Sequence, residues 1–485
     1  MSSLFSRGFN KKPTNTLFKS ANEDYDEKSF EELMQENEVP QEKIVLDPQQ
    51  SEAVMSESNN ILVVAGAGSG KTRVLTERIR HLIEDLDVPP SEIVAITFTN
   101  MAAEEMKLRL CYVKDISDSF IGTIHSFANR IMKESGEKYK LLTDELNVAI
   151  HRELIEKYCV HLTVDRYLEY TDLESEVAMG KQPESLLHNF FTPSENDDYS
   201  KLQYSAEFVD KDKEEPVHVT YGESFYTVCR DRSIITFDEL LRRAKNYFER
   251  KNIKCNYVFV DELQDVGHLE YSFIRSLNAS HYFFVGDDYQ SIYGFKGGNV
   301  NIFKNLVKDE TFTNYFLTNN YRSAKEILEF ADVIISQVDD RIKKDVVPVS
   351  TEEGRVEKYV KKDIFRILND IANKYYNGDF NLKDCFLLVR TNKELFEMTN
   401  MCGDIGLPCI TFKREGMSLV DMKKRMKKNA IKVLTVHTSK GLEADTVLLY
   451  GDFPVVLPYY RIQKEERKVM YVGITRARKR LMLFN

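Results

Sequence analysis

Short runs of apolar residues are the first regular feature along the chain, and a different kind of sequence follows each of them. Residues 61–65 are continuously apolar, and a second apolar run covers residues 257–260. The stretch after the first run repeats apolar side chains at helical spacing: Val74, Leu75, Ile79, Leu82 and Ile83. Runs of this length are typical of buried strands, and this spacing is typical of a helix with one face against a core. The pattern predicts two buried strands, the first of which is followed after a short turn by a helix.

Residues 141–232 open with the same helical spacing and end in a charged stretch that is rich in tyrosine. The apolar positions of the opening helix are Leu146, Ile150, Leu154, Ile155 and Tyr158. No run in the chain approaches the roughly 18 continuous apolar residues that a membrane-spanning helix needs. We therefore expect a mostly helical segment here, and a protein that has no membrane partner.

Length and cysteine usage limit the class of protein. A chain of 485 residues is long enough for two to four domains. Its seven cysteines are never spaced as C-x-x-C, which argues against a disulfide framework and against a zinc or iron–sulfur site. This usage is typical of a reducing compartment, so we expect a cytoplasmic location.

Charge is distributed unevenly along the chain. The net charge of −10 disfavours a nucleic-acid partner, although a groove can still be locally basic. Residues 22–38 hold much of the excess acid, and we expect residues 1–42 to be a disordered leader that offers a docking peptide to other proteins. Residues 413–432 are strongly basic. They form either a solvated helix face or a surface that contacts phosphates.

A glycine-rich turn, AGAGSGKT, follows the first apolar run. Glycines without side chains let successive backbone N–H groups surround phosphate oxygens at the positive end of the following helix. Lys71 can reach the outer phosphates of a nucleoside triphosphate, and the Thr72 hydroxyl can bind Mg²⁺. This P-loop comprises Ala65, Gly66, Ala67, Gly68, Ser69, Gly70, Lys71 and Thr72.

Two acidic residues end the second apolar run, in the sequence YVFVDELQD. An ATPase needs a carboxylate to hold Mg²⁺ and a second group to orient the attacking water. We expect Asp261 to hold Mg²⁺ through its water shell and Glu262 to act as the general base toward the water. Alone, two acids could simply mark a solvated strand end, but their pairing with a P-loop favours an ATP-hydrolysing site.

Further motifs extend from residue 46 to the C-terminus. They are LDPQQSEAV (46–54), AITFTNMAAEEM (95–106), GTIHSF (122–127), ITFDELL (235–241), VGDDYQSIYGFKGG (285–298), LTNNYRSAKEI (317–327), FLLVRTN (386–392), LTVHTSKGLEADTV (434–447) and EERKVMYVGITRARKRL (465–481). Together with the P-loop and VDELQD, and in this order, they resemble the motifs of superfamily 1 helicases of the UvrD/PcrA/Rep type.

The resemblance implies an α/β fold with two RecA-like P-loop NTPase domains, each a parallel sheet flanked by helices, and nucleotide in the cleft between them. The first domain is expected at residues 43–140 and 233–310, interrupted by an accessory insertion at 141–232. The second is expected at 311–485. Residues 393–430 stand where the family inserts a large accessory domain, and their number suffices only for a helix and a short basic hairpin or loop.

The resemblance also implies roles in binding and hydrolysing ATP. Arg322 and Arg476 match the two arginines that stabilise charge on the γ-phosphate, as an arginine finger does, and Gln290 matches the residue that senses this phosphate. Other matching positions would contact the adenine, the ribose or the rest of the nucleotide: Gln50, Arg73, Tyr321, Gly441 and Glu443.

A track for single-stranded DNA needs stacking surfaces interleaved with polar contacts. The family places stacking aromatics at Phe98, Tyr293 and Phe295, and polar DNA contacts at Thr123, His125, Arg390 and His437. Two adjacent positions depart from the family pattern: Phe295 stands where tryptophan is usual, and Lys296 stands where arginine is usual. Because Phe98 lies between two threonines on an alternating strand, ordinary core packing is an alternative role for it.

The expected function is that of an ATP-dependent, Mg²⁺-requiring DNA helicase that moves 3′→5′ on single-stranded DNA, with the direction implied by the sequence from Gln290 to Phe295. Its partners would be single-stranded DNA and its junctions with duplex, and the protein would be a monomer or a weak self-associate. Four alternatives stay open: a DNA-stimulated translocase that strips proteins without processive unwinding, an RNA-directed motor, a nucleic-acid-binding scaffold switched by ATP, and a small-molecule phosphotransferase.

Overall fold

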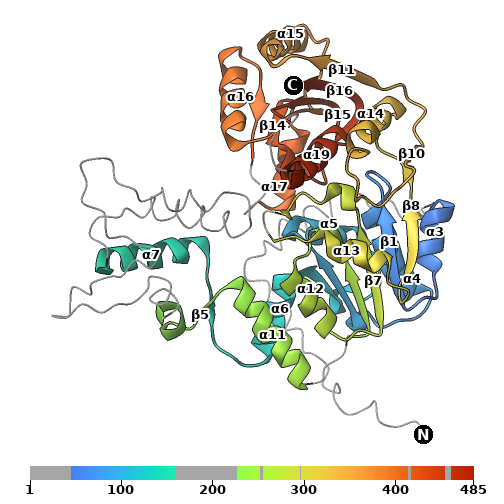
Figure 1. Ribbon diagram of the computed structural model, residues 1–485, viewed down its shortest axis with the longest axis vertical. Helices are drawn as coiled ribbons and strands as arrows, with labels where there is room; N and C mark the ends of the chain where they lie inside the picture. Colours follow the sequence, from blue (N-terminus) through green and yellow to red (C-terminus); the bar gives the residue numbers. More distant parts are fainter. Residues whose placement is uncertain (1–44, 159–226, 252–254, 295–296, 413–416, 454–459) are drawn as a thin grey trace.

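The computed structural model describes residues 45–158, 227–251, 255–294, 297–412, 417–453 and 460–485. Two domains lie one above the other, with the chain's C-terminus in the upper one (Figure 1). Each contains a six-stranded sheet whose strands are all parallel. The predicted α/β fold with two parallel-sheet domains is confirmed. Among the described helices, none combines the length and apolar character needed to cross a membrane.

The first sheet has the strand order β3-β2-β6-β7-β1-β8. Its strands are β1 (Asn60–Ala65), β2 (Ile93–Thr97), β3 (Phe120–Thr123), β6 (Tyr257–Val260), β7 (His281–Gly286) and β8 (Thr313–Leu317). Its helices are α3 (Pro48–Met55), α4 (Lys71–Glu84), α5 (Asn100–Leu110), α6 (Ile124–Glu134), α11 (Phe237–Lys251), α12 (His268–Ser276) and α13 (Val300–Val307), with the 3-10 turns η1 (Pro90–Glu92), η2 (Ile116–Asp118), η3 (Leu263–Asp265) and η4 (Asp288–Gln290).

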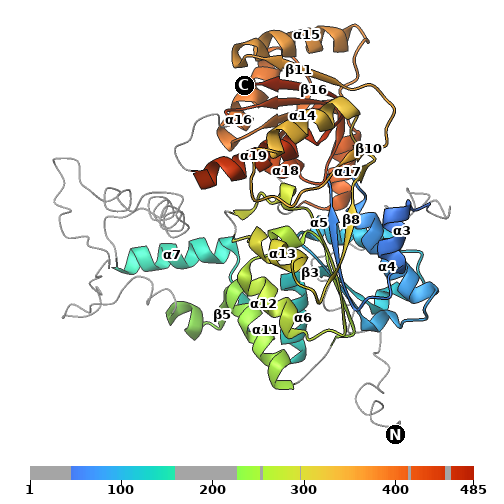
Figure 2. The ribbon, with the colours of Figure 1, turned by 45° about the vertical axis from the view of Figure 1, so that its right-hand side comes forward.

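Helices cover both faces of this sheet, as Figure 2 shows. Successive strand side chains point to opposite faces. On β1, Leu62 and Val64 pack into the core under α6, α11 and α12, whereas Ile61 and Val63 pack with α4 and α5. Both faces of the strand are therefore buried, which explains the continuous apolar run in the sequence.

The second sheet has the strand order β11-β16-β15-β12-β14-β13. Its strands are β11 (Arg355–Tyr359), β12 (Cys385–Val389), β13 (Cys409–Ile410), β14 (Ile431–Thr435), β15 (Ala444–Tyr450) and β16 (Ala477–Phe484). The helices around it are α14 (Lys325–Ile335), α15 (Ile364–Tyr376), α16 (Asn392–Asp404), α17 (Leu419–Lys427), α18 (Val436–Ser439) and α19 (Tyr460–Ile474), with the 3-10 turn η6 (Lys361–Asp363).

The first sheet extends beyond the boundary expected at residue 310. Strand β8 pairs in parallel with β1 along five residues, so the first domain includes at least residues 313–317. Directly after it, the short strand β9 (Asn319–Asn320) pairs with β10 (Val347–Pro348), which follows α14 in the chain. The chain therefore passes between the two domains more than once near this point.

Residues 393–430 contain more regular structure than the helix and short basic hairpin or loop that their number was expected to allow. They contribute α16, the sheet strand β13 and the helix α17, which carries much of the predicted basic stretch. Helix α17 reaches the first domain: the Leu419 N–H donates to Glu104 of α5 at 2.8 Å, and Val420 packs on Leu108. This short segment joins the two domains directly.

The segment predicted to be an accessory insertion is described at its two ends. Strand β4 (Lys140–Leu141) pairs with β5 (Ile234–Ile235), and α7 (Asp144–Tyr158) begins the insertion as the helical spacing predicts. Residues 159–226, like the predicted leader at 1–42, lie outside the described residues.

Replacing Phe284 on β7 by alanine should destabilise the first domain. Its side chain is fully buried and stacks on Phe312 with ring centroids 5.5 Å apart, so we expect a loss of about 3–5 kcal/mol in the free energy of unfolding. Urea unfolding followed by circular dichroism measures this loss. Phe316→Ala on the edge strand β8, where the side chain is 40% exposed, should lose less than half as much. Equal losses would contradict the assigned core.

Candidate nucleotide and nucleic-acid site

The P-loop closes tightly between β1 and α4. Gly68 and Gly70 have φ angles of 66° and 84°, in the left-handed region that favours glycine. A Cβ on Gly68 would lie 2.8 Å from the Asn320 amide, and a Cβ on Gly70 would lie 2.9 Å from that of Gln50. The loop thus needs both glycines, and its backbone is bare of side chains where a phosphate would approach.

Gln50 holds the P-loop rather than standing apart from it. Its side-chain amide donates to the Ser69 carbonyl at 3.0 Å, and its carbonyl oxygen closes a capping box with Asp47 at the start of α3. Tyr321, the residue matched to adenine stacking, is 44% exposed and donates its hydroxyl to Asp47. The structure therefore brings Gln50 and Tyr321 to the same side of the P-loop, and Arg73 is exposed on the first turn of α4.

The two residues predicted to hold a metal ion lie together. The Thr72 hydroxyl donates to Asp261 Oδ2 at 3.2 Å. Burial, and then the neighbouring Glu262 carboxylate, raise the pKa of Asp261 to about 7, so its negative charge is not fully compensated by the protein. Within the described residues, no group of three or more His, Cys, Asp or Glu side chains is arranged to hold a metal. Hard oxygen ligands from one carboxylate and one hydroxyl fit Mg²⁺, which commonly takes its remaining ligands from water and substrate phosphates.

Glu262 occupies a strained position at the end of β6. Its φ of 54° lies in the left-handed region, which a non-glycine residue adopts at a cost of order 1–3 kcal/mol. Burial alone would raise the pKa of this carboxyl, but Lys440, with Nζ 3.8 Å away, Lys71 and a hydrogen bond from Gln264 hold the pKa below its usual value. The side chain is therefore kept ionised, as a general base must be.

A chain of polar contacts crosses from the first domain to the second. Asp287 lies 3.8 Å from the Lys71 ammonium and accepts from the Gln290 amide at 2.6 Å. The side-chain oxygen of Gln290, Oε1, in turn accepts a hydrogen bond from Arg476 at 3.2 Å. Burial, and then the charge of nearby Arg322, lower the pKa of the Arg476 guanidinium to about 9. Both predicted arginines thus lie at the boundary between the domains.

Arg322 and Glu443, assigned separately by resemblance, are partners in this structure. Arg322 Nε donates to Glu443 at 2.6 Å, and its NH1 donates to the Thr475 carbonyl. Glu443 also accepts from Arg478 at 3.4 Å. The two residues matched to the ribose contact and to the γ-phosphate contact therefore already touch each other at the domain boundary. Gly441, with φ of 82°, lies two residues before Glu443.

Two of the predicted stacking aromatics meet at the domain boundary. Phe98 stacks on Tyr293 with ring centroids 5.1 Å apart, and the Tyr293 hydroxyl donates to the His437 carbonyl of the second domain at 3.3 Å. Phe98 is half-buried and contacts an aromatic partner rather than the centre of the sheet core. Phe295 and Lys296 lie outside the described residues.

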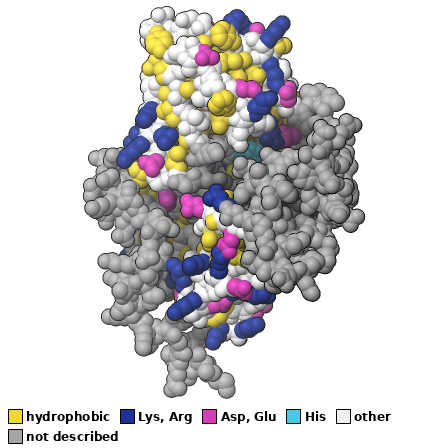
Figure 3. Space-filling model, turned by 90° about the vertical axis from the view of Figure 1, so that its left-hand side faces the viewer, with side chains coloured by type: hydrophobic (Ala, Val, Ile, Leu, Met, Phe, Trp, Pro, Cys, Tyr) yellow, Lys and Arg dark blue, Asp and Glu magenta, His cyan; other side chains and the backbone are white. Residues whose placement is uncertain are grey.

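The predicted polar contacts to DNA are not equally available. Thr123 caps α6, and burial lowers the pKa of His125, whose ring lies 5.1 Å from the 46% exposed Phe237. Arg390 is paired with Glu466 of α19 through both Nε and NH2. Arg390 is therefore engaged by Glu466 in this structure, and its contact with DNA stays a prediction. On the face in Figure 3, Lys and Arg side chains are scattered over both domains among Asp and Glu.

Sequence reasoning missed three residues at this site. Phe237 adds an exposed aromatic ring beside His125. Lys440 of the second domain donates to Asp265 and to the Gln290 carbonyl of the first; its position directly before Gly441, inside a recognised motif, was an available signal. Lys344 bonds Asp287 and Asp288 from a segment without a recognised motif, so nothing local could have indicated it.

Comparisons with known proteins cover nearly all of the described chain. Residues 46–311 match the family model of the UvrD/REP helicase N-terminal domain, and residues 315–419 and 414–485 match that of the UvrD-like helicase C-terminal domain. A probable DNA helicase of Mycoplasma pneumoniae is 26% identical, over 90% of this chain and 83% of its own length. ATP-dependent DNA helicases PcrA of Leuconostoc citreum and Staphylococcus aureus are 32% and 29% identical, over 64% and 73% of this chain. The chain spans only 41% and 50% of the length of these two PcrA proteins.

Replacing Gln50 by alanine tests which of its contacts matters. Because its amide supports the P-loop through the Ser69 carbonyl, we expect the loss of a buried hydrogen bond to cost about 1–2 kcal/mol of stability and to weaken ATP and GTP binding alike. Gln49→Ala, which removes hydrogen bonds to Thr318 instead, is the matched control. Isothermal titration with both nucleotides measures the effect. Loss of ATP binding with GTP binding unchanged would assign Gln50 to adenine reading alone.

Proposed function

The chain belongs to the UvrD/REP family of DNA helicases, and from this premise we propose that it hydrolyses ATP to move 3′→5′ along single-stranded DNA and to separate the strands of a duplex. The family uses ATP with Mg²⁺, and the P-loop, Thr72 and Asp261 fit these ligands. Because the chain is much shorter than its PcrA relatives, the activity of the whole protein is a proposal that needs a direct test.

One observation carries this proposal: the residues for hydrolysis and those for base stacking are physically continuous. Gln290 is the last residue of η4, and Tyr293 follows three positions later on the same segment. Lys440 Nζ donates to the backbone carbonyl of Gln290 at 3.0 Å. It also lies 3.8 Å from the Glu262 carboxylate and 5.1 Å from the centre of the Tyr293 ring. Lys440 therefore lies next to both Glu262, the proposed general base, and Tyr293, which stacks on Phe98. A displacement of Glu262 would be transmitted to this aromatic pair through the single side chain of Lys440.

The residues of the site have complementary roles in hydrolysis. Lys71, Arg322 and Arg476 supply positive charge toward the phosphates, and Glu262 orients a water molecule and accepts its proton. Thr72 and Asp261 would hold Mg²⁺, which neutralises charge on the phosphate oxygens when bound.

Two finer alternatives concern what the motor acts on. Residues 393–430 form α16, β13 and α17 instead of a large accessory domain, which favours a motor that translocates and strips proteins without processive unwinding as the second candidate. An RNA-directed motor is the third, because stacking and phosphate contacts discriminate poorly between RNA and DNA. The direction of movement rests on the resemblance of the sequence from Gln290 to Phe295.

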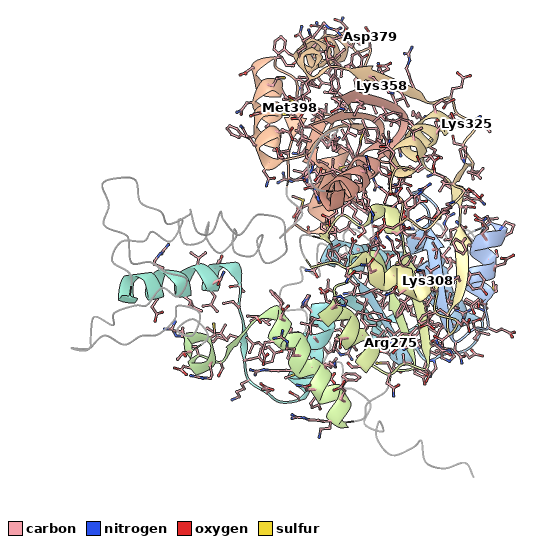
Figure 4. The ribbon with its side chains drawn as sticks, viewed as in Figure 1. Arg275, Lys308, Lys325, Lys358, Asp379 and Met398 are labelled. Carbon is pink, nitrogen blue, oxygen red and sulfur yellow. The ribbon has the colours of Figure 1, made fainter. Side chains whose placement is uncertain are left out.

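Steady-state ATP hydrolysis, with and without single-stranded DNA, tests the proposed function. We expect strong stimulation by DNA in the wild type. Lys71→Ala should lose activity through weak nucleotide binding, whereas Glu262→Gln should keep binding and lose turnover by about 10²–10⁴-fold, because it lacks the general base. Lys325→Ala, an exposed substitution on the outer side of the second domain (Figure 4), is the control and should behave as wild type.

This assay, together with a strand-separation assay on tailed duplexes, distinguishes the alternatives. Equal stimulation by single-stranded RNA would favour the RNA-directed motor. DNA stimulation without strand separation on duplexes carrying a 3′ or a 5′ tail would favour a translocase, and separation on the 5′-tailed duplex alone would reverse the proposed direction. No stimulation by either nucleic acid, with basal hydrolysis intact, would overturn the proposal.

A further inference from the structure

A segment of the second domain returns to the P-loop. We call residues 341–348 the return segment; it follows α14 and ends in β10, which pairs with β9 beside Tyr321. Val346 of this segment lies 3.0 Å from the point where a Cβ on Gly66 would be. The return segment is therefore packed against the start of the nucleotide site, although by sequence it belongs to the second domain.

Lys344 is the buried charge of the return segment. Its ammonium donates to Asp287 Oδ1 at 2.5 Å, to Asp288 Oδ1 at 2.8 Å and to the Ala65 carbonyl at 3.2 Å, and it lies 3.9 Å from the centre of the Tyr289 ring. The Ile342 N–H donates to the other oxygen of Asp288 at 2.8 Å. All three hydrogens of the ammonium have partners, so its position is fixed.

Asp287 is shared between this lysine and the nucleotide site. Its Oδ1 accepts from Lys344 and from the Tyr289 N–H. Its Oδ2 accepts from Gln290 at 2.6 Å and lies 3.8 Å from Lys71 Nζ. Lys344 at 2.5 Å is thus the close cation of Asp287, and Lys71 is the distant one.

We propose that Lys344 is a positioning residue, which neutralises and orients Asp287 so that Lys71 stays available for the outermost phosphate of ATP. This inference rests on the proposed function. Without Lys344, the buried carboxylate would attract Lys71 into a close ion pair and would face the incoming phosphate with an uncompensated negative charge. Both effects oppose the binding of a triphosphate more than that of a diphosphate, which lacks the outermost group.

Nucleotide titration of Lys344→Met tests the proposal without DNA and without turnover. The probes are a fluorescent, non-hydrolysable ATP analogue and the corresponding fluorescent ADP, each with Mg²⁺. We expect the dissociation constant to rise about tenfold for the triphosphate and less than threefold for the diphosphate, since a tenfold change needs only a modest loss of interaction free energy. Equal weakening of both nucleotides would indicate a general loosening of the P-loop and would overturn the proposal.

Two further variants keep the test sharp. Lys343→Met changes the exposed neighbouring lysine and should leave both constants within twofold of wild type. Lys344→Met combined with Asp288→Asn preserves the net charge of the buried group, which protects the fold if the single variant is unstable. The double variant should still discriminate against the triphosphate, because Asp287 has lost its lysine; a return to wild-type binding would show that only net charge matters and would overturn the proposal.

The result can be separated from the fate of the proposed function. If the wild type shows no DNA-stimulated hydrolysis, the proposed function fails, yet selective loss of triphosphate binding in Lys344→Met would still support the role of Lys344. If DNA stimulation is present, and both Lys344→Met and its combination with Asp288→Asn bind the two nucleotides as wild type does, only the proposed role of Lys344 is contradicted.

Discussion

Charge balance across the boundary between the two domains is the constraint on which the site depends. The first domain ends its central strands in acidic residues: Asp261, Glu262, Asp265, Asp287 and Asp288. Much of their compensation comes from the second domain, through Lys344 and Lys440. Removing one partner of a buried ion pair leaves an uncompensated charge, which is strongly destabilising. The docking of the domains and the ionisation of the site therefore depend on each other. A bound triphosphate, which brings its own negative charge, competes with these carboxylates for the same cations.

Local strain gathers where the chemistry is expected. Glu262 is held in the left-handed region, Gly68 and Gly70 leave no room for a Cβ, and the pKa of Asp261 is raised by burial and by Glu262. The backbone of Glu262 and the buried charge of Asp261 cost stability in the absence of ligand, whereas glycine adopts the left-handed region without strain. Strained backbone like that of Glu262 persists only where the surrounding structure fixes it. Here Gln50 and Asn320 hold the loop from two sides.

The sequence predicted what local patterns determine. The apolar runs of β1 and β6 were readable because both faces of these strands are buried, and motif spacing brought Thr72 and Asp261 together correctly. Strand β8 was not predicted, because it lies at the sheet edge and its sequence, TNYFL, begins with two polar residues. Contacts between residues far apart in the sequence could not be predicted. No local pattern around Arg390 indicates its pairing with Glu466, and none around Lys344 indicates its pairing with Asp287, 57 positions away. Such pairings are set by tertiary packing alone.

The connections between the domains differ in what they touch. Helix α17 contacts α5 through the Leu419 N–H, which donates to Glu104, and through Val420, which packs on Leu108; Met101 of α5 also belongs to the same buried cluster as Leu419 and Met422. The segment that contains β9, and the return segment that pairs with it, both press directly on the P-loop. A change in how the two domains sit against each other at these segments would therefore act directly on the phosphate-binding loop.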